Sequence, residues 1–147
     1  MLVFLDIDGV MVPAKAWQRP ELLKDGFPAF SSKAVCALNK LIDTDTTIVL
    51  TTSHKARYTL EEWSSMFSSR GVVVHHIASL EDNVHHLSRK DEIVNWFSQH
   101  EVHEDFIIID DDSSLQALPA PMKEHLLLTQ SMIGLTEEQL AFAEALL

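Results

Sequence analysis

The sequence has few cysteines and few glycines. It contains one cysteine, Cys36, and only 4 glycines among 147 residues. A single cysteine excludes an internal disulfide and is typical of a protein that works in a reducing compartment. The fold must therefore depend on an apolar core, and a chain of this length can bury one in a single domain spanning residues 1–147.

Basic residues and long apolar runs are scarce as well. The 11 Lys and Arg residues are outnumbered by 22 Asp and Glu residues, for a formal net charge of -11. Such a surface repels phosphate backbones, so we expect no tight non-specific nucleic-acid binding. The apolar start lacks a basic leader and soon reaches Asp6, and no later run could span a bilayer. We expect a soluble, cytoplasmic protein with no membrane partner, and the oligomeric state stays open.

The sequence does contain an alternation of short apolar runs and helical patterns. Helices are predicted over residues 31–43, from Thr59, from Ser88 and from Thr136, and those at Thr59 and Thr136 begin with capping boxes. Runs with strand character occupy residues 2–5, 46–51, 71–77, 105–110 and 125–129. This alternation predicts an α/β fold, a three-layer Rossmann-like sandwich around a mainly parallel sheet.

Acidic residues follow two of the apolar runs. Asp6 and Asp8 follow the first run, and the cluster 110–112 follows the fourth. Alternate residues of a strand point the same way, so we expect Asp6 and Asp8 to project from one side. If the two strands are neighbours, both clusters meet beyond the carboxyl ends of the sheet. That much negative charge calls for a hard divalent cation, and Mg2+ is the economical choice.

Two other interpretations explain the aspartates less well. Aspartates favour turns, which accounts for either cluster alone but not readily for both together. An EF-hand calcium loop needs a glycine at its sixth position, where this chain has Met11.

Four short motifs, in order, resemble the signatures of the haloacid dehalogenase (HAD) superfamily of phosphohydrolases. "DIDGV" is similar to the first signature, DxDG[TV]. "IVLTTS" supplies the hydroxyl residue of the second, Thr52, with Thr51 or Ser53 as alternatives. "LSRKDEI" supplies the basic residue of the third, Lys90, with Arg89 as the alternative.

The fourth signature is an acidic pair after an apolar strand, and "FIIIDDD" supplies Asp110 and Asp111. Within the superfamily, the motifs look most similar to small phosphatase-like domains attached to RNA-repair enzymes. The intervals between the motifs are too short for the superfamily's large cap domains. The chain therefore resembles a capless, HAD-like domain.

The resemblance and the chemistry of phosphoryl transfer together imply a role for each motif residue. Asp6 would attack phosphorus and form an aspartyl-phosphate, and Asp8 would protonate the leaving oxygen and then activate water. Gly9 would let the chain turn beside the bound phosphate. Thr52 would hydrogen-bond a phosphoryl oxygen. Lys90 would offset negative charge, a use that would explain a cation in the first turn of a helix.

The implied metal ligands come from both acidic clusters. Asp111 is expected to be the main side-chain ligand of Mg2+, with Asp110 in support. Asp6 contributes its carboxylate, and Asp8 its backbone carbonyl. Asp112 could be only a helix cap or turn residue.

Further residues are candidates for substrate contact. Ser53, His54 and Lys55 directly follow Thr52. The irregular stretch 11–30 contains three prolines and follows the first acidic pair, which suggests a substrate-facing loop in which Lys15, Trp17 and Arg19 could take part.

The pairs His75–His76 and His85–His86 resemble metal-binding pairs. They are assigned to the surface or core, because neighbours on an extended chain point to opposite faces and cannot easily bind one ion.

The sequence thus predicts a capless, Mg2+-dependent phosphatase acting through an aspartyl-phosphate. Its substrate would be a small phosphomonoester or a phosphorylated macromolecular end. Two alternatives stay open: a non-catalytic binding module with the same fold, and a receiver-like signalling domain that is phosphorylated on aspartate. The receiver would need an acceptor aspartate after a middle strand, and the run 71–77 ends without one.

Overall fold

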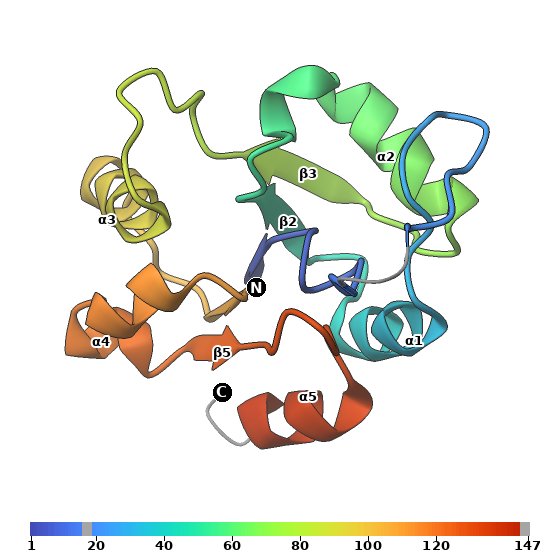
Figure 1. The fold of residues 1–147 in the computed structure, drawn as a ribbon. Coiled ribbons are helices and arrows are strands. Elements are labelled where there is room, and N and C mark those ends of the chain that lie inside the picture. The colour runs from blue at the N-terminus through green and yellow to red at the C-terminus, as the bar shows by residue number, and fades with distance from the viewer. Residues whose placement is uncertain (16–18, 145–147) are drawn as a thin grey trace.

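The computed structural model describes residues 1–15 and 19–144 and contains one five-stranded parallel sheet (Figure 1). Its strands are β1 (Leu2–Leu5), β2 (Thr47–Leu50), β3 (His76–Ser79), β4 (Phe106–Asp110) and β5 (Leu126–Leu128). Their order across the sheet is β3-β2-β1-β4-β5. The chain winds outward from β1 to β3, then crosses to β4 on the other side of β1, so the strand order reverses between β1 and β4. The predicted α/β, Rossmann-like fold is confirmed.

Helices cover both faces of this sheet. The helices are α1 (Ser32–Leu41), α2 (Leu60–Ser69), α3 (Arg89–Gln99), α4 (Ala120–Lys123) and α5 (Glu137–Glu144), with short 3₁₀ helices η1 (Lys55–Arg57) and η2 (Ser113–Ala117). One core contains buried side chains of α1, α2 and α5 packed on β1, β2 and β4. The other core joins α3, η2 and α4 to the opposite face. The sheet is therefore the middle layer of three, as predicted.

The predicted helix starts are confirmed by their caps. The Ser31 and Ser88 side chains accept hydrogen bonds from the first turns of α1 and α3. Thr59 and Glu62 form the reciprocal capping box of α2. Thr136 pairs with Gln139 in the same way before α5. Local sequence chemistry thus sets where these helices begin.

The third strand lies further along the chain than predicted. The run 71–77 was expected to be a strand, but β3 spans His76–Ser79. Gly71, at φ +86°, follows the end of α2, and the next residue, Val72, is buried in the core. Val73 is 62% exposed, so this valine run does not form a continuous buried strand. Pairing with β2 begins only at His76.

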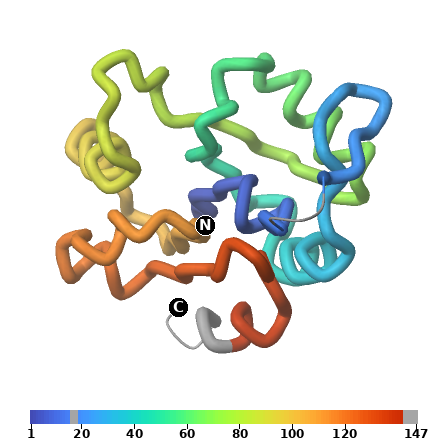
Figure 2. The backbone as a smooth tube through the Cα atoms, viewed as in Figure 1, coloured from blue at the N-terminus to red at the C-terminus, as the bar shows by residue number. Residues whose placement is uncertain are grey.

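No large cap domain interrupts the described part of the chain. The segment between β1 and α1 is a loop, and its described part includes an antiparallel bridge between Leu22 and Pro28. After β5 the chain returns beside the turn that follows β1 (Figure 2). There the Leu135 N–H donates to the carbonyl of Val10. Among the described residues, no helix has the length and apolarity needed to cross a membrane.

Candidate active site

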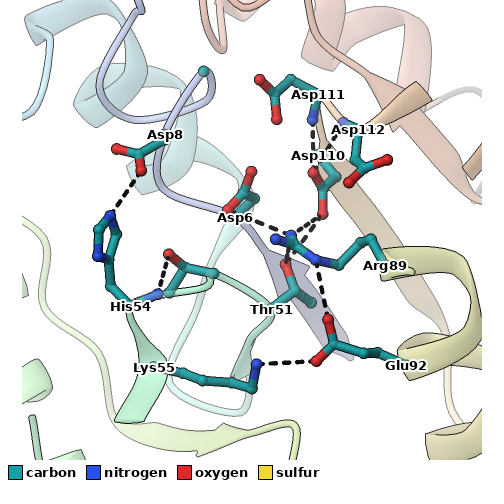
Figure 3. Close-up of polar contacts among 12 residues, drawn as sticks. Asp6, Asp8, Thr51, His54, Lys55, Arg89, Glu92, Asp110, Asp111 and Asp112 are labelled. Atoms are coloured by element: carbon teal, nitrogen blue, oxygen red, sulfur yellow. Dashed lines mark hydrogen bonds and ion pairs between the residues drawn. The ribbon is translucent and has the colours of Figure 1, made fainter. Parts of the chain in front are cut away.

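Three neighbouring strands end in polar residues at the same level. Leu5 of β1 is paired with Leu50 of β2 and with Ile109 of β4. The residues that directly follow Leu5, Leu50 and Ile109 are Asp6, Thr51 and Asp110. Their three side chains lie next to one another (Figure 3). Their exposed fractions are 5%, 0% and 0%. Parallel pairing thus gathers two carboxylates and a hydroxyl at the point where the strand order reverses.

Arg89, the first residue of α3, joins this group from the side (Figure 3). Its Nη1 lies 2.7 Å from Asp110 Oδ2 and 3.4 Å from Asp6 Oδ1. The same nitrogen donates to Thr51 Oγ1 at 3.2 Å. One guanidinium therefore contacts both carboxylates and the Thr51 hydroxyl.

Glu92 in turn holds Arg89. Its Oε1 lies 3.6 Å from Arg89 Nε, and its Oε2 accepts from Lys55 Nζ at 2.9 Å. The Lys55 side chain is only 4% exposed. Lys55, predicted to contact substrate, is thus turned inward and supports Arg89 through Glu92.

Asp110 and Asp111 differ in how fully their oxygens are used. Asp110 accepts from Arg89 and Thr51 at Oδ2 and from the backbone N–H groups of Asp111 and Asp112 at Oδ1. Asp111 Oδ2 accepts from the Ser131 hydroxyl at 2.7 Å. Ligand oxygens of Asp6, Asp110 and Asp111 all lie within 4.8 Å of one another. Since the bonds to Asp110 occupy both of its oxygens, Asp6 and Asp111 have more capacity left for a cation.

The turn after β1 is shaped around Asp111. Gly9 has φ +78°, and a Cβ at this position would collide with the Asp111 carboxylate. The Gly9 carbonyl accepts from the buried Thr129 hydroxyl at 2.8 Å. The sharp turn expected at Gly9 is confirmed, and residues after β5, which the sequence did not point to, support it.

Burial strongly perturbs the charges of this site. Burial, followed by repulsion from Asp110, raises the pKa of Asp6 to about 9, although Arg89 opposes the shift. Burial also raises the pKa of Asp110. Burial alone would lower the pKa of Arg89, but attraction by Asp110 and Asp6 raises it. Arg89 therefore stays charged, and one proton is retained among the carboxylates when no cation is bound.

Two site residues were predicted one position too far along the sequence. Lys90 Nζ lies 3.9 Å from Asp91, and Arg89 occupies the place expected for it. Thr52 accepts from the His54 N–H, whereas Thr51 faces the carboxylates. Helix α3 begins at Arg89, and the strand register selects Thr51, so the alternatives named for both motifs are the residues that face the site.

Asp8 does not share a side with Asp6. Strand β1 ends at Leu5, and the chain turns at once, so strand alternation does not extend to Asp8. The Asp8 side chain is 57% exposed, and its Oδ2 lies 2.8 Å from His54 Nε2 (Figure 3). It is not part of the cluster of oxygens formed by Asp6, Asp110 and Asp111. Asp112 Oδ1 accepts from Ser114 N–H, in agreement with the cap or turn role considered for it.

The other candidates lie outside this cluster. Ser53, Lys15 and Arg19 are exposed, and Trp17 falls outside the described residues. Ser53 also lines a cavity of about 240 Å³ next to Lys55 and Glu92. The paired histidines, assigned to the surface or core, all lie at the surface: His75, His76, His85 and His86.

The donor set fits a hard divalent cation. The oxygens of Asp6, Asp110 and Asp111 converge, and Arg89 contacts only the first two of these carboxylates. Oxygen ligands of this kind suit Mg2+ better than softer metals. The excess negative charge, which otherwise retains a proton, would be neutralised by such an ion.

Comparison with known proteins identifies a family. The family model described as HAD domain in Swiss Army Knife RNA repair proteins matches residues 2–140. No curated protein and no solved structure matches the chain. The matched range includes every residue of the site described above.

Proposed function

The chain belongs to the family of HAD domains in Swiss Army Knife RNA repair proteins, and from this premise we propose that it is a Mg2+-dependent phosphomonoester hydrolase. The observation that carries the proposal is the convergence of Asp6, Thr51 and Asp110 on one guanidinium, that of Arg89. Asp111 adds a third carboxylate to this group. Such a group can hold a phosphoryl dianion, a cation and a nucleophile close together at the carboxyl end of the sheet.

The proposed reaction has two steps. An oxygen of Asp6 forms a bond to phosphorus while the bond to the leaving oxygen breaks, and Asp8 gives a proton to that oxygen. Water then attacks the phosphorus of the aspartyl-phosphate and gives a proton to Asp8. The bond to Asp6 breaks, and inorganic phosphate leaves. Arg89 would donate hydrogen bonds to the phosphoryl oxygens, which carry the charge throughout. The Thr51 hydroxyl, which donates to Asp110 Oδ2 in the structure, would turn from it to donate to a phosphoryl oxygen.

Asp6, Asp111 and the backbone carbonyl of Asp8 are the proposed Mg2+ ligands. Asp110 would orient Arg89 and Thr51, because its oxygens already accept four hydrogen bonds from the protein. A bound Mg2+ would neutralise charge on the phosphoryl oxygens and favour the carboxylate form of Asp6.

The family description suggests the substrate class. We propose a phosphorylated RNA end, because the family is named for RNA repair proteins and the described chain has no large cap over the site. A small phosphomonoester is the other candidate. The cytoplasm is the proposed location, since the single cysteine excludes an internal disulfide. A non-catalytic module and a receiver-like domain are not favoured by the family assignment.

The test is release of inorganic phosphate from a panel of phosphomonoesters that includes oligoribonucleotides with 5′- or 3′-terminal phosphate. We expect activity with Mg2+, none with excess chelator, and none in Asp6→Asn. A chain that binds Mg2+ but hydrolyses no member of the panel would contradict a phosphatase. Unchanged activity of Asp6→Asn would contradict its role as nucleophile.

Matched variants test the position of each motif. Arg89→Met should lower kcat/KM by about 100-fold or more, as expected for a lost transition-state contact, whereas Lys90→Met should change it little. Asp111→Asn should raise the Mg2+ concentration needed for half-maximal activity far more than Asp112→Asn. The reverse order in either pair would show that the site has been assigned one residue out of place.

A further inference from the structure

The proposed general acid, Asp8, has a partner that the proposed reaction does not yet use. The Asp8 carboxylate lies apart from those of Asp110 and Asp111 and points toward His54 (Figure 3). The His54 ring is 28% exposed, and its Nε2 lies 2.8 Å from Asp8 Oδ2. Asp8 is therefore separate from the carboxylate cluster and close to a histidine from the loop after β2.

The surroundings of His54 determine which of its ring nitrogens carries the proton. Arg57 Nη1 lies 3.3 Å from His54 Nδ1, and an arginine can only donate. The Nδ1 atom must therefore accept, which leaves the proton of the neutral ring on Nε2. It follows that Nε2–H donates to Asp8 Oδ2, and a chain of hydrogen bonds runs from Arg57 through His54 to Asp8.

The position of the ring is set by local structure. The His54 N–H donates to Thr52 Oγ1, and His54 immediately precedes η1 (Lys55–Arg57), which carries Arg57. Phe27, which is 1% exposed, forms a T-shaped contact with the ring, with 5.6 Å between centroids. The histidine is thus held by its backbone, by Arg57 at Nδ1 and by the Phe27 ring.

We propose that His54 is a positioning residue that orients Asp8 for proton transfer to the leaving oxygen. This inference rests on the phosphatase function proposed above. An aspartate side chain that is 57% exposed would otherwise sample several rotamers. The hydrogen bond from His54 engages Oδ2 and leaves Oδ1 as the carboxyl oxygen that can face the leaving group.

The consequence for catalysis depends on the leaving group. General acid catalysis contributes about 10² to 10⁴-fold when the leaving oxygen is strongly basic. It contributes little when the leaving group departs readily as an anion. A loss of orientation at Asp8 should therefore slow hydrolysis of an alkyl phosphate and leave hydrolysis of p-nitrophenyl phosphate nearly unchanged.

The test compares His54→Phe with His54→Gln. Phenylalanine keeps a ring against Phe27 but has no donor, and the amide of glutamine can still donate to Asp8. For an alkyl phosphate, we expect His54→Phe to lower kcat/KM by about 10 to 100-fold, and His54→Gln to restore most of it. For p-nitrophenyl phosphate, both variants should stay within about threefold of wild type. The ratio kcat/KM is used because it reports formation of the aspartyl-phosphate and not its hydrolysis.

A double-mutant cycle separates orientation from structural damage. If His54 acts through Asp8, His54→Phe should have no further effect on the alkyl phosphate in an Asp8→Asn background. Equal losses on both substrates, or a full further loss in that background, would overturn the proposal. An inactive wild type would overturn the phosphatase function itself, so the two failures are distinguishable.

Discussion

Asp6 is subject to opposing demands from folding and from the proposed chemistry. It is 5% exposed, and its pKa is raised to about 9, mainly by burial and then by Asp110. Attack on phosphorus requires the carboxylate form. A metal-free protein near neutral pH therefore holds the proposed nucleophile protonated, and binding of a divalent cation should release that proton.

The stability of the metal-free protein should reflect this proton. The pKa of Asp6 is about 9 in the folded state against an ordinary value of 3.8, so the unfolded chain binds fewer protons between these pH values. Wild type should accordingly lose stability as pH rises through this window, by up to about 1.4 kcal/mol per pH unit from this group. Asp6→Asn has no such proton.

The measurement is urea unfolding of wild type and Asp6→Asn in excess chelator, at about pH 6 and about pH 8. The free energy of unfolding of Asp6→Asn, minus that of wild type, should be larger at the higher pH. A difference that does not change with pH would contradict a neutral, buried Asp6.

The sequence carries information about the site beyond the four motifs, in the residue that follows each apolar run. The runs LVFL, TIVL and FIII are each followed directly by a polar residue, and these residues are Asp6, Thr51 and Asp110. Aligning the strand ends would have selected Thr51 over Thr52. The contacts of Asp111 with Ser131 and of Gly9 with Thr129 could not be predicted in this way, because they join residues 20 and 120 positions apart.

At the scale of elements, residues 25–28 of the loop between β1 and α1 make more contacts than their sequence suggests. Asp25 Oδ1 and Oδ2 accept from two nitrogens of Arg70, at 2.9 and 2.7 Å. Arg70 also donates to the carbonyls of Phe27 and Pro28. The loop is therefore fastened to the end of α2. A pairing across 45 residues leaves no periodic signal, so the stretch looked irregular.

Asp25→Asn should loosen this attachment. The hydrogen bonds from Arg70 lower the pKa of Asp25 to about 2, so the ion pair contributes stability above about pH 4 and loses it as pH falls through 2. We expect a loss of about 1–2 kcal/mol near neutral pH, since the pair is partly exposed.

Thermal or urea unfolding of Asp25→Asn and wild type at several pH values is the measurement. The difference should shrink toward acid pH, opposite in sign to the trend for Asp6→Asn. Because Phe27 contacts His54, the variant should also weaken the orientation of Asp8. An unchanged free energy of unfolding would show that the Arg70 contacts to the loop carbonyls are sufficient by themselves.

At the scale of the molecule, the alternation of strands and helices was enough to predict the sandwich. The strand order was not predictable, because it depends on which strands meet across the sheet and not on local pattern. That order places β1 between β2 and β4, and this arrangement brings the motifs together. The prediction of a site at the carboxyl ends of the strands therefore depended on an assumption of adjacency that the structure supports.

The charge of the whole molecule leads to a prediction about salt. A net charge of -11 should repel a phosphorylated oligoribonucleotide over distances of about the Debye length, near 10 Å at 0.1 M ionic strength. Raising monovalent salt from about 50 to about 200 mM, at saturating Mg2+, should therefore raise kcat/KM for the oligonucleotide. A small phosphomonoester should respond much less. A steep fall with salt, as in proteins that bind nucleic acids through basic patches, would instead show that local cations near the site outweigh the charge of the whole molecule.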